Sequence, residues 1–62
     1  MRDKNIICIH MILESEQRRL NAMLSRIDKV KDKNDLVLLE QGLELAEHYM
    51  HVARDMCKEV EL

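Results

Sequence analysis

The stretch "KDKND", residues 31–35, separates two halves of the chain whose helical patterns do not share a register. All five residues are polar. Asp32, Asn34 and Asp35 have side chains that accept hydrogen bonds from the free N–H groups at a helix start. No Gly follows the first half, so Asn34 is the candidate for a left-handed residue that ends the first helix. We therefore predict a turn at 31–34 between helices near 4–30 and 35–60.

Apolar residues recur on both sides of this turn at alternating steps of three and four, which is the spacing of a helical stripe. The first stripe is Ile6, Ile9, Leu13, Leu20, Met23, Ile27 and Val30, broken by Glu16; the second is Leu36, Leu39, Leu43, Ala46, Met50, Ala53, Cys57 and Val60. The second stripe is offset by two residues from a continuation of the first. Coiled coils absorb insertions of three or four residues, but not two, so the pattern indicates two helices instead of one rod.

The composition supports an all-α hairpin in a single domain. The chain has 62 residues, one Gly, no Pro, and Tyr49 as its only Phe, Tyr or Trp residue. Hairpins of β-strands need turn residues that are missing here. A chain of this size buries only ~60% of its unfolded surface and is marginally stable alone. We therefore expect a second subunit or another stabilising device.

The second helix has more apolar surface than one neighbouring helix can cover. Leu38, Leu45 and Val52, spaced by seven, stand beside the main stripe. Two hairpins together could cover this wide arc as a four-helix bundle with coiled-coil-like packing. Closed two-fold dimers are the commonest assemblies, so a homodimer is the simplest prediction. The predicted dimer core is Leu36, Leu39, Leu43, Ala46, Tyr49, Met50 and Ala53.

The stretch "IICIHMIL", residues 6–13, contains one polar residue in eight, so its apolar side chains point in several directions. In an antiparallel hairpin the far end of the second helix lies level with it and covers only one side. Another subunit or a larger protein partner is needed for the rest. The predicted partner-binding patch is Ile7, Cys8, Met11, Ile12 and Met56.

The charges are unevenly divided along the chain. Residues 1–33 carry eight Lys or Arg against five acids, and residues 34–62 carry two against seven. Complementary packing of the two halves explains this division, and so does an anionic partner for the first helix. A nucleic-acid interface, the second explanation, would use Arg18, Arg19, Arg26, Lys29 and Lys33.

The length, the two helices, the polar turn and the small residues Ala46 and Ala53 among Leu and Met resemble the Rop family. Its members are helical hairpins that dimerise into four-helix bundles and bind paired RNA loops. The resemblance implies an RNA-binding regulator that acts through its basic first helix. It concerns the architecture and no single motif, so it assigns no residue of this chain to RNA contact.

The stretch "ELAEHYMH", residues 44–51, offers a possible metal site. Glu44, Glu47, His48 and His51 share one side of a helix at spacings of three and four. Two imidazoles and a carboxylate could bind Zn, Ni or Cu. The alternative is an exposed face with ordinary side-chain pairs between adjacent turns.

Three further positions each have two interpretations. Cys8 and Cys57 lie near the same end of a hairpin, either as two small hydrophobic residues or as a redox-sensitive pair. Glu16 is either a buried polar residue that fixes the register or an exposed one. Gly42 marks either a close approach of the helices or a tolerated exposed glycine, at a cost of ~1 kcal/mol relative to Ala.

These observations predict a small non-enzymatic regulatory or adaptor protein that acts through protein–protein interaction. We expect no cofactor and no small-molecule substrate. No apolar run approaches the ~20 residues that span a membrane, so we expect no membrane association and a cytoplasmic location. The alternatives are the RNA-binding regulator and the metal-binding bundle described above.

Overall fold

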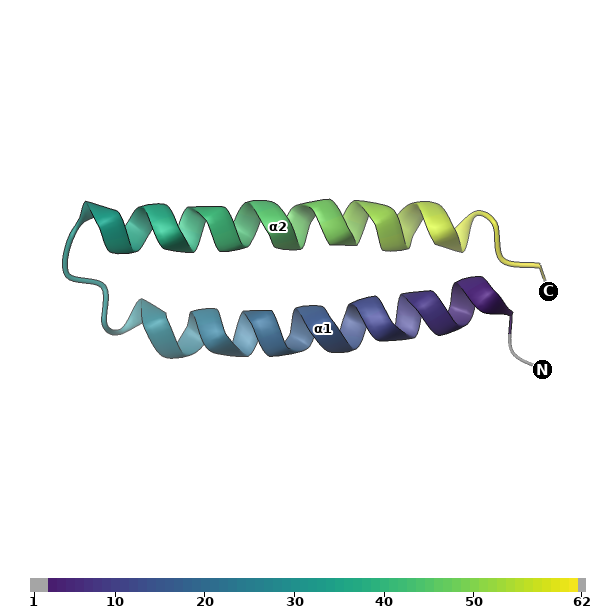
Figure 1. Ribbon diagram of the computed structural model, residues 1–62, viewed down its shortest axis with the longest axis horizontal. Coiled ribbons are helices and arrows are strands. Elements are labelled where there is room, and N and C mark those ends of the chain that lie inside the picture. Colours follow the sequence, from purple (N-terminus) through teal and green to yellow (C-terminus); the bar gives the residue numbers. More distant parts are fainter. Residues whose placement is uncertain (1–2, 62) are drawn as a thin grey trace.

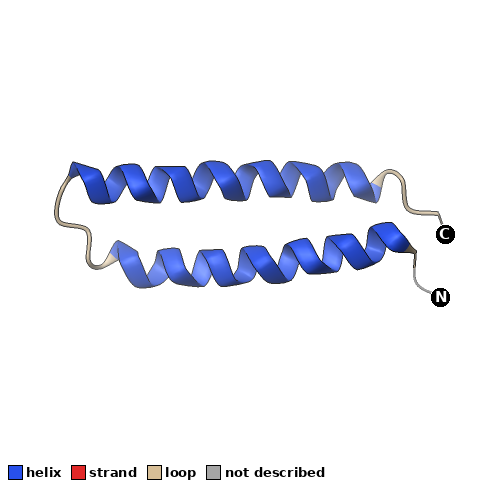
Figure 2. Ribbon diagram, viewed as in Figure 1, coloured by secondary structure: helices blue, strands red, loops and turns tan. Residues whose placement is uncertain are grey.

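The computed structural model describes residues 3–61, which form two antiparallel helices joined by a short loop (Figure 1). Helix α1 comprises Lys4–Ile27 and helix α2 comprises Lys33–Cys57. The two termini lie at one end and the loop at the other, and the described residues contain no strand (Figure 2). The prediction of an all-α helical hairpin is confirmed.

The loop lies slightly earlier in the chain than the sequence suggested, because Asp32 caps α2. Its carboxylate accepts a hydrogen bond from Asp35 N at 3.0 Å, and the Asp35 carboxylate accepts one from Lys31 N at 2.9 Å. These two bonds begin α2 at Lys33 instead of residue 35. Each satisfies an N–H group that the helix itself cannot pair.

Helix α1 ends at Ile27 without a left-handed residue. Its C-cap, Asp28, keeps a helical φ of −74°. Lys29 N donates to Arg26 O at 2.9 Å, which tightens the last turn. No non-glycine residue among 3–61 has a positive φ. The left-handed prediction for Asn34 is wrong, because the chain reverses through extended Asp32 and Asn34 already belongs to α2.

Polar contacts close the other end of the hairpin and set its register. The Asp3 carboxylate accepts from Asn5 N at 2.7 Å and so caps α1. Asn5 Nδ2 donates to Glu59 O at 3.2 Å, which links the two helix ends. Near the loop, Met23 of α1 lies against Gly42 of α2. Residues whose numbers sum to about 65 therefore lie level with each other.

The hairpin encloses very little apolar volume. The buried hydrophobic residues are Met23, Ala46 and Ala53, and the most buried side chain of the described residues is charged Glu16. Meanwhile 13 large hydrophobic residues among 3–61 are exposed. A single pair of helices has only one contact line, so most of each apolar stripe stays outside it.

The shape reflects this open construction. The hairpin measures 48 × 16 × 10 Å and has a radius of gyration of 14.7 Å, against about 11 Å for a compact domain of this length. Its accessible surface is 5,440 Å², about 1,200 Å² more than the ~4,200 Å² typical of a monomer of this mass. Neither described helix has the length and apolar character needed to cross a membrane.

Candidate functional site

The line of contact between the helices follows the predicted stripes only in part. On α1 it includes Ile9, Ile12, Glu16, Arg19 and Met23, and on α2 it includes Leu39, Gly42, Ala46, Ala53 and Met56, all buried or half-buried. Only part of each stripe is therefore used within the hairpin. The remaining stripe residues of both helices are not covered by the partner helix and could contact another protein chain.

Six stripe residues outside this contact line, together with Leu24, form an apolar surface, which we call the leucine-rich face. A helix advances 100° per residue, and in an antiparallel pair the same angular offset from the contact line falls on the same side of both helices. This geometry places seven exposed residues on one face of the hairpin. They are Leu13, Leu20, Leu24, Ile27, Leu36, Leu43 and Met50.

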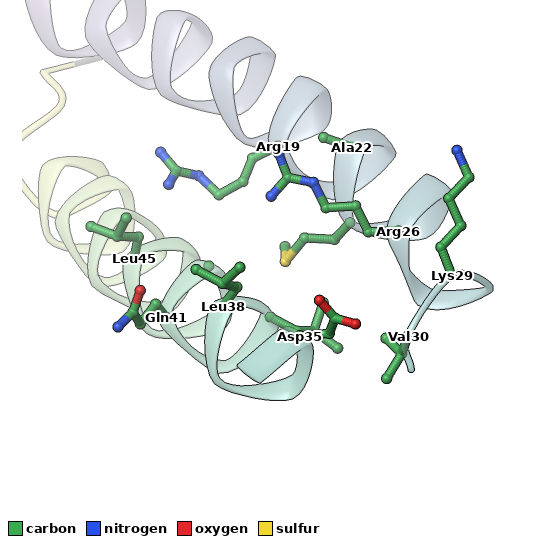
Figure 3. Close-up of a pocket in the computed structure, with 12 residues that line it drawn as sticks. Arg19, Ala22, Arg26, Lys29, Val30, Asp35, Leu38, Gln41 and Leu45 are labelled. Atoms are coloured by element: carbon green, nitrogen blue, oxygen red, sulfur yellow. The ribbon is translucent and has the colours of Figure 1, made fainter. Parts of the chain in front are cut away.

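The opposite face contains a groove of about 710 Å³ near the loop, which we call the basic groove (Figure 3). Its floor is apolar and its α1 edge is cationic. In Figure 3 the side chains of Arg19 and Arg26 come from α1 and that of Lys29 from the loop that follows it, and Leu38 and Leu45 face them from α2. Ala22, Met23, Val30, Leu39 and Gly42 complete the apolar lining, with Asp35 and Gln41 on the α2 side.

Glu16 lies inside the hairpin with 1% of its surface exposed. Arg19 Nε is 3.1 Å from Glu16 Oε2, but the two atoms do not make a well-directed hydrogen bond. The contact is therefore an ion pair between imperfectly satisfied groups. The Arg19 guanidinium also lies over the Tyr49 ring, 5.6 Å from its centroid, in the range of a cation–π contact. Of the two interpretations of Glu16, the structure supports the buried one.

Gly42 permits the helices to approach closely at the floor of the basic groove. A Cβ atom at this position would lie 3.0 Å from the Met23 sulfur. Gly42 is half-buried. Of its two interpretations, the close approach is the one that the structure supports.

The predicted partner-binding patch does not form one surface. Cys8, Met11, Ile12 and Met56 lie on the side of the basic groove, toward the open end, whereas helical geometry directs Ile7 away from α2. Met11 is 63% exposed and Ile7 46% exposed. Ile12 and Met56 are half-buried because they line the contact between the helices.

The predicted dimer core divides into two groups. Leu39, Ala46 and Ala53 pack inside the hairpin, and Tyr49 contacts Arg19 at the edge of the contact line. Leu36, Leu43 and Met50 belong to the leucine-rich face. The α1 contribution to that face was not predicted as a site. The signal was present in the spacing of seven between Leu13, Leu20 and Ile27.

The five predicted nucleic-acid residues do not lie together. Arg19, Arg26 and Lys29 line the basic groove. Arg18 and Lys33 are exposed and lie outside its lining. Helical rotation explains the division, because Arg18 is 100° from Arg19 and points away from α2.

The predicted metal ligands do not converge. Among residues 3–61 no group of three or more His, Cys, Asp or Glu side chains is placed to hold a metal ion. His51 Nδ1 lies 3.0 Å from Arg54 Nη2, and the His48 ring packs edge-on against Tyr49 at 5.3 Å between centroids. Glu44 and Glu47 are exposed on the same helix. The structure thus gives no support to the metal alternative.

Cys8 and Cys57 are both free and exposed. Both lie near the open end, but helical geometry places Cys8 on the groove side and Cys57 on the side of the leucine-rich face.

The basic first half and the acidic second half of the chain are not joined by ion pairs among the described residues. The described residues contain two ion pairs, Arg19–Glu16 and Lys58–Asp55, and a contact between His10 and Glu14, each between neighbouring turns of one helix or its end. Helix pairing therefore does not depend on ion pairs between the two halves.

Searches against protein-family models, curated proteins and solved structures found no match to this chain.

Proposed function

We propose that this chain is a non-enzymatic regulatory or adaptor protein that works as a homodimer through protein–protein contacts. The observation that carries the proposal is the leucine-rich face, which extends over both helices and is exposed in the single hairpin. A surface of this extent on a small protein typically marks an interaction site.

The surface area supports a second copy as the partner on this face. The single chain exposes about 1,200 Å² more than a compact monomer of its mass. A standard protein interface removes roughly 800 Å² from each partner, and obligate homodimers remove more. The excess is thus of the size that one self-association interface would remove, and two hairpins packed in this way would form a four-helix bundle.

The chemistry of the two faces also supports this assignment. The seven residues of the leucine-rich face are all aliphatic or Met, and charged neighbours such as Glu40 and Glu47 lie at its edge. The basic groove instead combines apolar and cationic side chains. Homodimer interfaces are the more apolar class of interface, so the leucine-rich face suits self-association better than the groove does.

The remaining features support binding over catalysis. The groove lining has one carboxylate, Asp35, and no His, Ser or Cys residue. Nucleophilic catalysis needs a nucleophile and a base within hydrogen-bond reach, usually in a cleft. An RNA-binding regulator stays as the alternative, since Arg19, Arg26 and Lys29 line one groove, but the floor between them and Leu38 is apolar.

Sedimentation equilibrium of charge-substituted variants tests the proposal. Leu20→Glu and Leu43→Glu each place a carboxylate on the leucine-rich face, where a dimer would bury it without a partner. We expect the natural chain to sediment as a dimer at micromolar concentration and both variants to shift toward monomer.

Val37→Glu is the matched control. Val37 is exposed like Leu43, and lies on α2 away from both helix–helix contact and the leucine-rich face. The same charge change there should leave the mass unchanged. A natural chain that is monomeric and fully helical at all concentrations would contradict the proposal.

A further inference from the structure

We infer that the basic groove binds an acidic amphipathic helix of a partner protein. The inference deepens the proposed function, since it names the chemistry of the partner and assigns it to the face that dimerisation leaves free.

Two cations, Arg26 at the end of α1 and Lys29 in the loop that follows it, border the groove on one side. Arg19 is occupied by Glu16 and by the Tyr49 ring. Arg26 and Lys29 make no ion pair with any residue of the part of the chain that the structure describes. Two cations without acidic partners therefore border the groove and are free to pair with carboxylates.

The floor beneath them is apolar and long enough for more than one side chain. Leu38 is 58% exposed and Leu45 is 48% exposed, and the two lie two helical turns apart on α2. Ala22 and Met23 of α1 line the groove opposite them. A helix laid into such a groove inserts apolar residues at spacings of three and four and keeps its polar side outside.

Charge decides between acidic and basic occupants. A helix whose apolar stripe is bordered by Glu or Asp would bring carboxylates to Arg26 and Lys29, whereas a basic helix would meet repulsion there. The phosphates of an RNA partner could pair with the cations of the groove, but its polar groups would not suit the apolar floor. The lining offers no aromatic ring for a base to stack on.

The test titrates the full chain, labelled with ¹⁵N, with a designed acidic amphipathic peptide that carries Leu at helical spacing and Glu elsewhere. A twin peptide with Lys in place of Glu and a short RNA hairpin serve as comparison probes. We expect amide shifts for the acidic peptide alone, centred on Ala22, Leu38 and Leu45. Equal shifts with the basic twin, shifts confined to the leucine-rich face, tighter binding of the RNA, or no shifts with any probe would overturn the inference.

The double variant Arg26→Glu, Lys29→Glu then tests the role of charge. We expect about tenfold weaker binding of the acidic peptide at low salt and a smaller difference at high salt. The matched control is Arg18→Glu, Lys33→Glu, which makes the same charge change outside the groove and should leave binding within about twofold. If both double variants weakened peptide binding equally, the effect would come from the net charge of the protein and not from the groove, and the inference would be overturned.

Sedimentation of the same variants separates this inference from the proposed function. Arg26→Glu, Lys29→Glu should remain dimeric, because it leaves the leucine-rich face intact. A dimer that fails to bind the acidic peptide refutes the groove assignment alone, and a monomer that binds it refutes the dimer alone. Loss of the dimer on reversal of the groove charges would show that the groove is itself the self-association surface, and would overturn the inference.

Discussion

The Glu16 carboxylate is removed from water at the centre of the hairpin, although its neighbour Arg19 does not direct an N–H group well toward it. The two members of the pair differ in their access to solvent. The Arg19 side chain is 27% exposed and also rests on the Tyr49 ring. Arg19 can therefore reach water without Glu16, whereas Glu16 has no comparable alternative.

This difference predicts unequal effects of the two deletions. Arg19→Met keeps an unbranched side chain as far as the position of Nε but removes the guanidinium and leaves an uncompensated buried carboxylate, so we expect a loss of about 3 kcal/mol in the free energy of unfolding. Glu16→Leu removes the buried charge and adds apolar volume, so the loss should be below about 1 kcal/mol, or stability should rise. Urea unfolding at one fixed protein concentration measures both. Equal losses would contradict this account.

Gly42 gives a second prediction at the residue scale. Gly42→Ala should gain helix propensity of up to ~1 kcal/mol. The new methyl group would meet the Met23 sulfur at 3.0 Å, near the end of a flexible side chain that can move by a few tenths of an ångström. We expect a small net rise in the free energy of unfolding. Gly42→Leu should lower it by ~1–3 kcal/mol, because the larger side chain forces the helices apart. A fall for Gly42→Ala would show that Met23 cannot adjust.

The two helices illustrate which parts of an element the sequence can predict. Helix type and number followed from the alternating three and four spacing and from the polar run at 31–35, because both depend on local pattern. The line of contact between the two helices could not be predicted from this local pattern. Leu13 and Leu43 fit the apolar stripes as well as Ile9 and Ala46 do, and only tertiary packing decides which of them faces the other helix.

The candidate surfaces show the same limit. The basic groove joins Arg26 of α1 to Leu38 of α2, and their proximity depends on the register of the two helices, in which Asn5 meets Glu59 and Met23 meets Gly42. The sequence pattern pointed to both residues, but as parts of different features: Arg26 in the predicted nucleic-acid interface and Leu38 beside the second apolar stripe. Burial of Glu16 was also undecidable, because a polar residue in an apolar stripe is compatible with either orientation until its neighbours are known.

The cap of α2 gives a prediction at the scale of the element. Asp32→Ala removes the acceptor of Asp35 N and should lower the free energy of unfolding by about 1 kcal/mol. Asp32→Asn should have a smaller effect, because the amide oxygen still accepts the bond. Thermal unfolding followed by circular dichroism measures each change.

The control is Asp28→Ala in the same loop. Asp28 is exposed and its negative charge stands at the C-terminus of α1, where the helix dipole disfavours it. Its removal should be neutral or slightly stabilising. If Asp28→Ala and Asp32→Ala lowered stability equally, the effect would belong to loop composition instead of the cap.

The whole molecule is best described as a hairpin with two different faces. An unfolded chain of this mass exposes ~10,700 Å², and a domain of about 60 residues normally buries ~60% of that area on folding. The single hairpin, with 5,440 Å² still exposed, buries about half. If a second copy covers the leucine-rich face, as proposed above, we expect folding and self-association to be coupled.

That coupling predicts that the unfolding temperature depends on protein concentration. For a folded dimer in equilibrium with unfolded chains, a hundredfold increase in concentration adds about 2.7 kcal/mol per dimer, which corresponds to a rise of about 10 °C for two chains of this length. Circular dichroism melts between 2 and 200 µM measure the shift. Leu43→Glu, which we expect to weaken the dimer, should melt at a lower temperature than the natural chain at every concentration, and Val37→Glu should follow the natural chain. A concentration-independent melt of the natural chain would mean that the hairpin is stable alone, in which case the leucine-rich face would have to be reassigned from a second copy to a different partner.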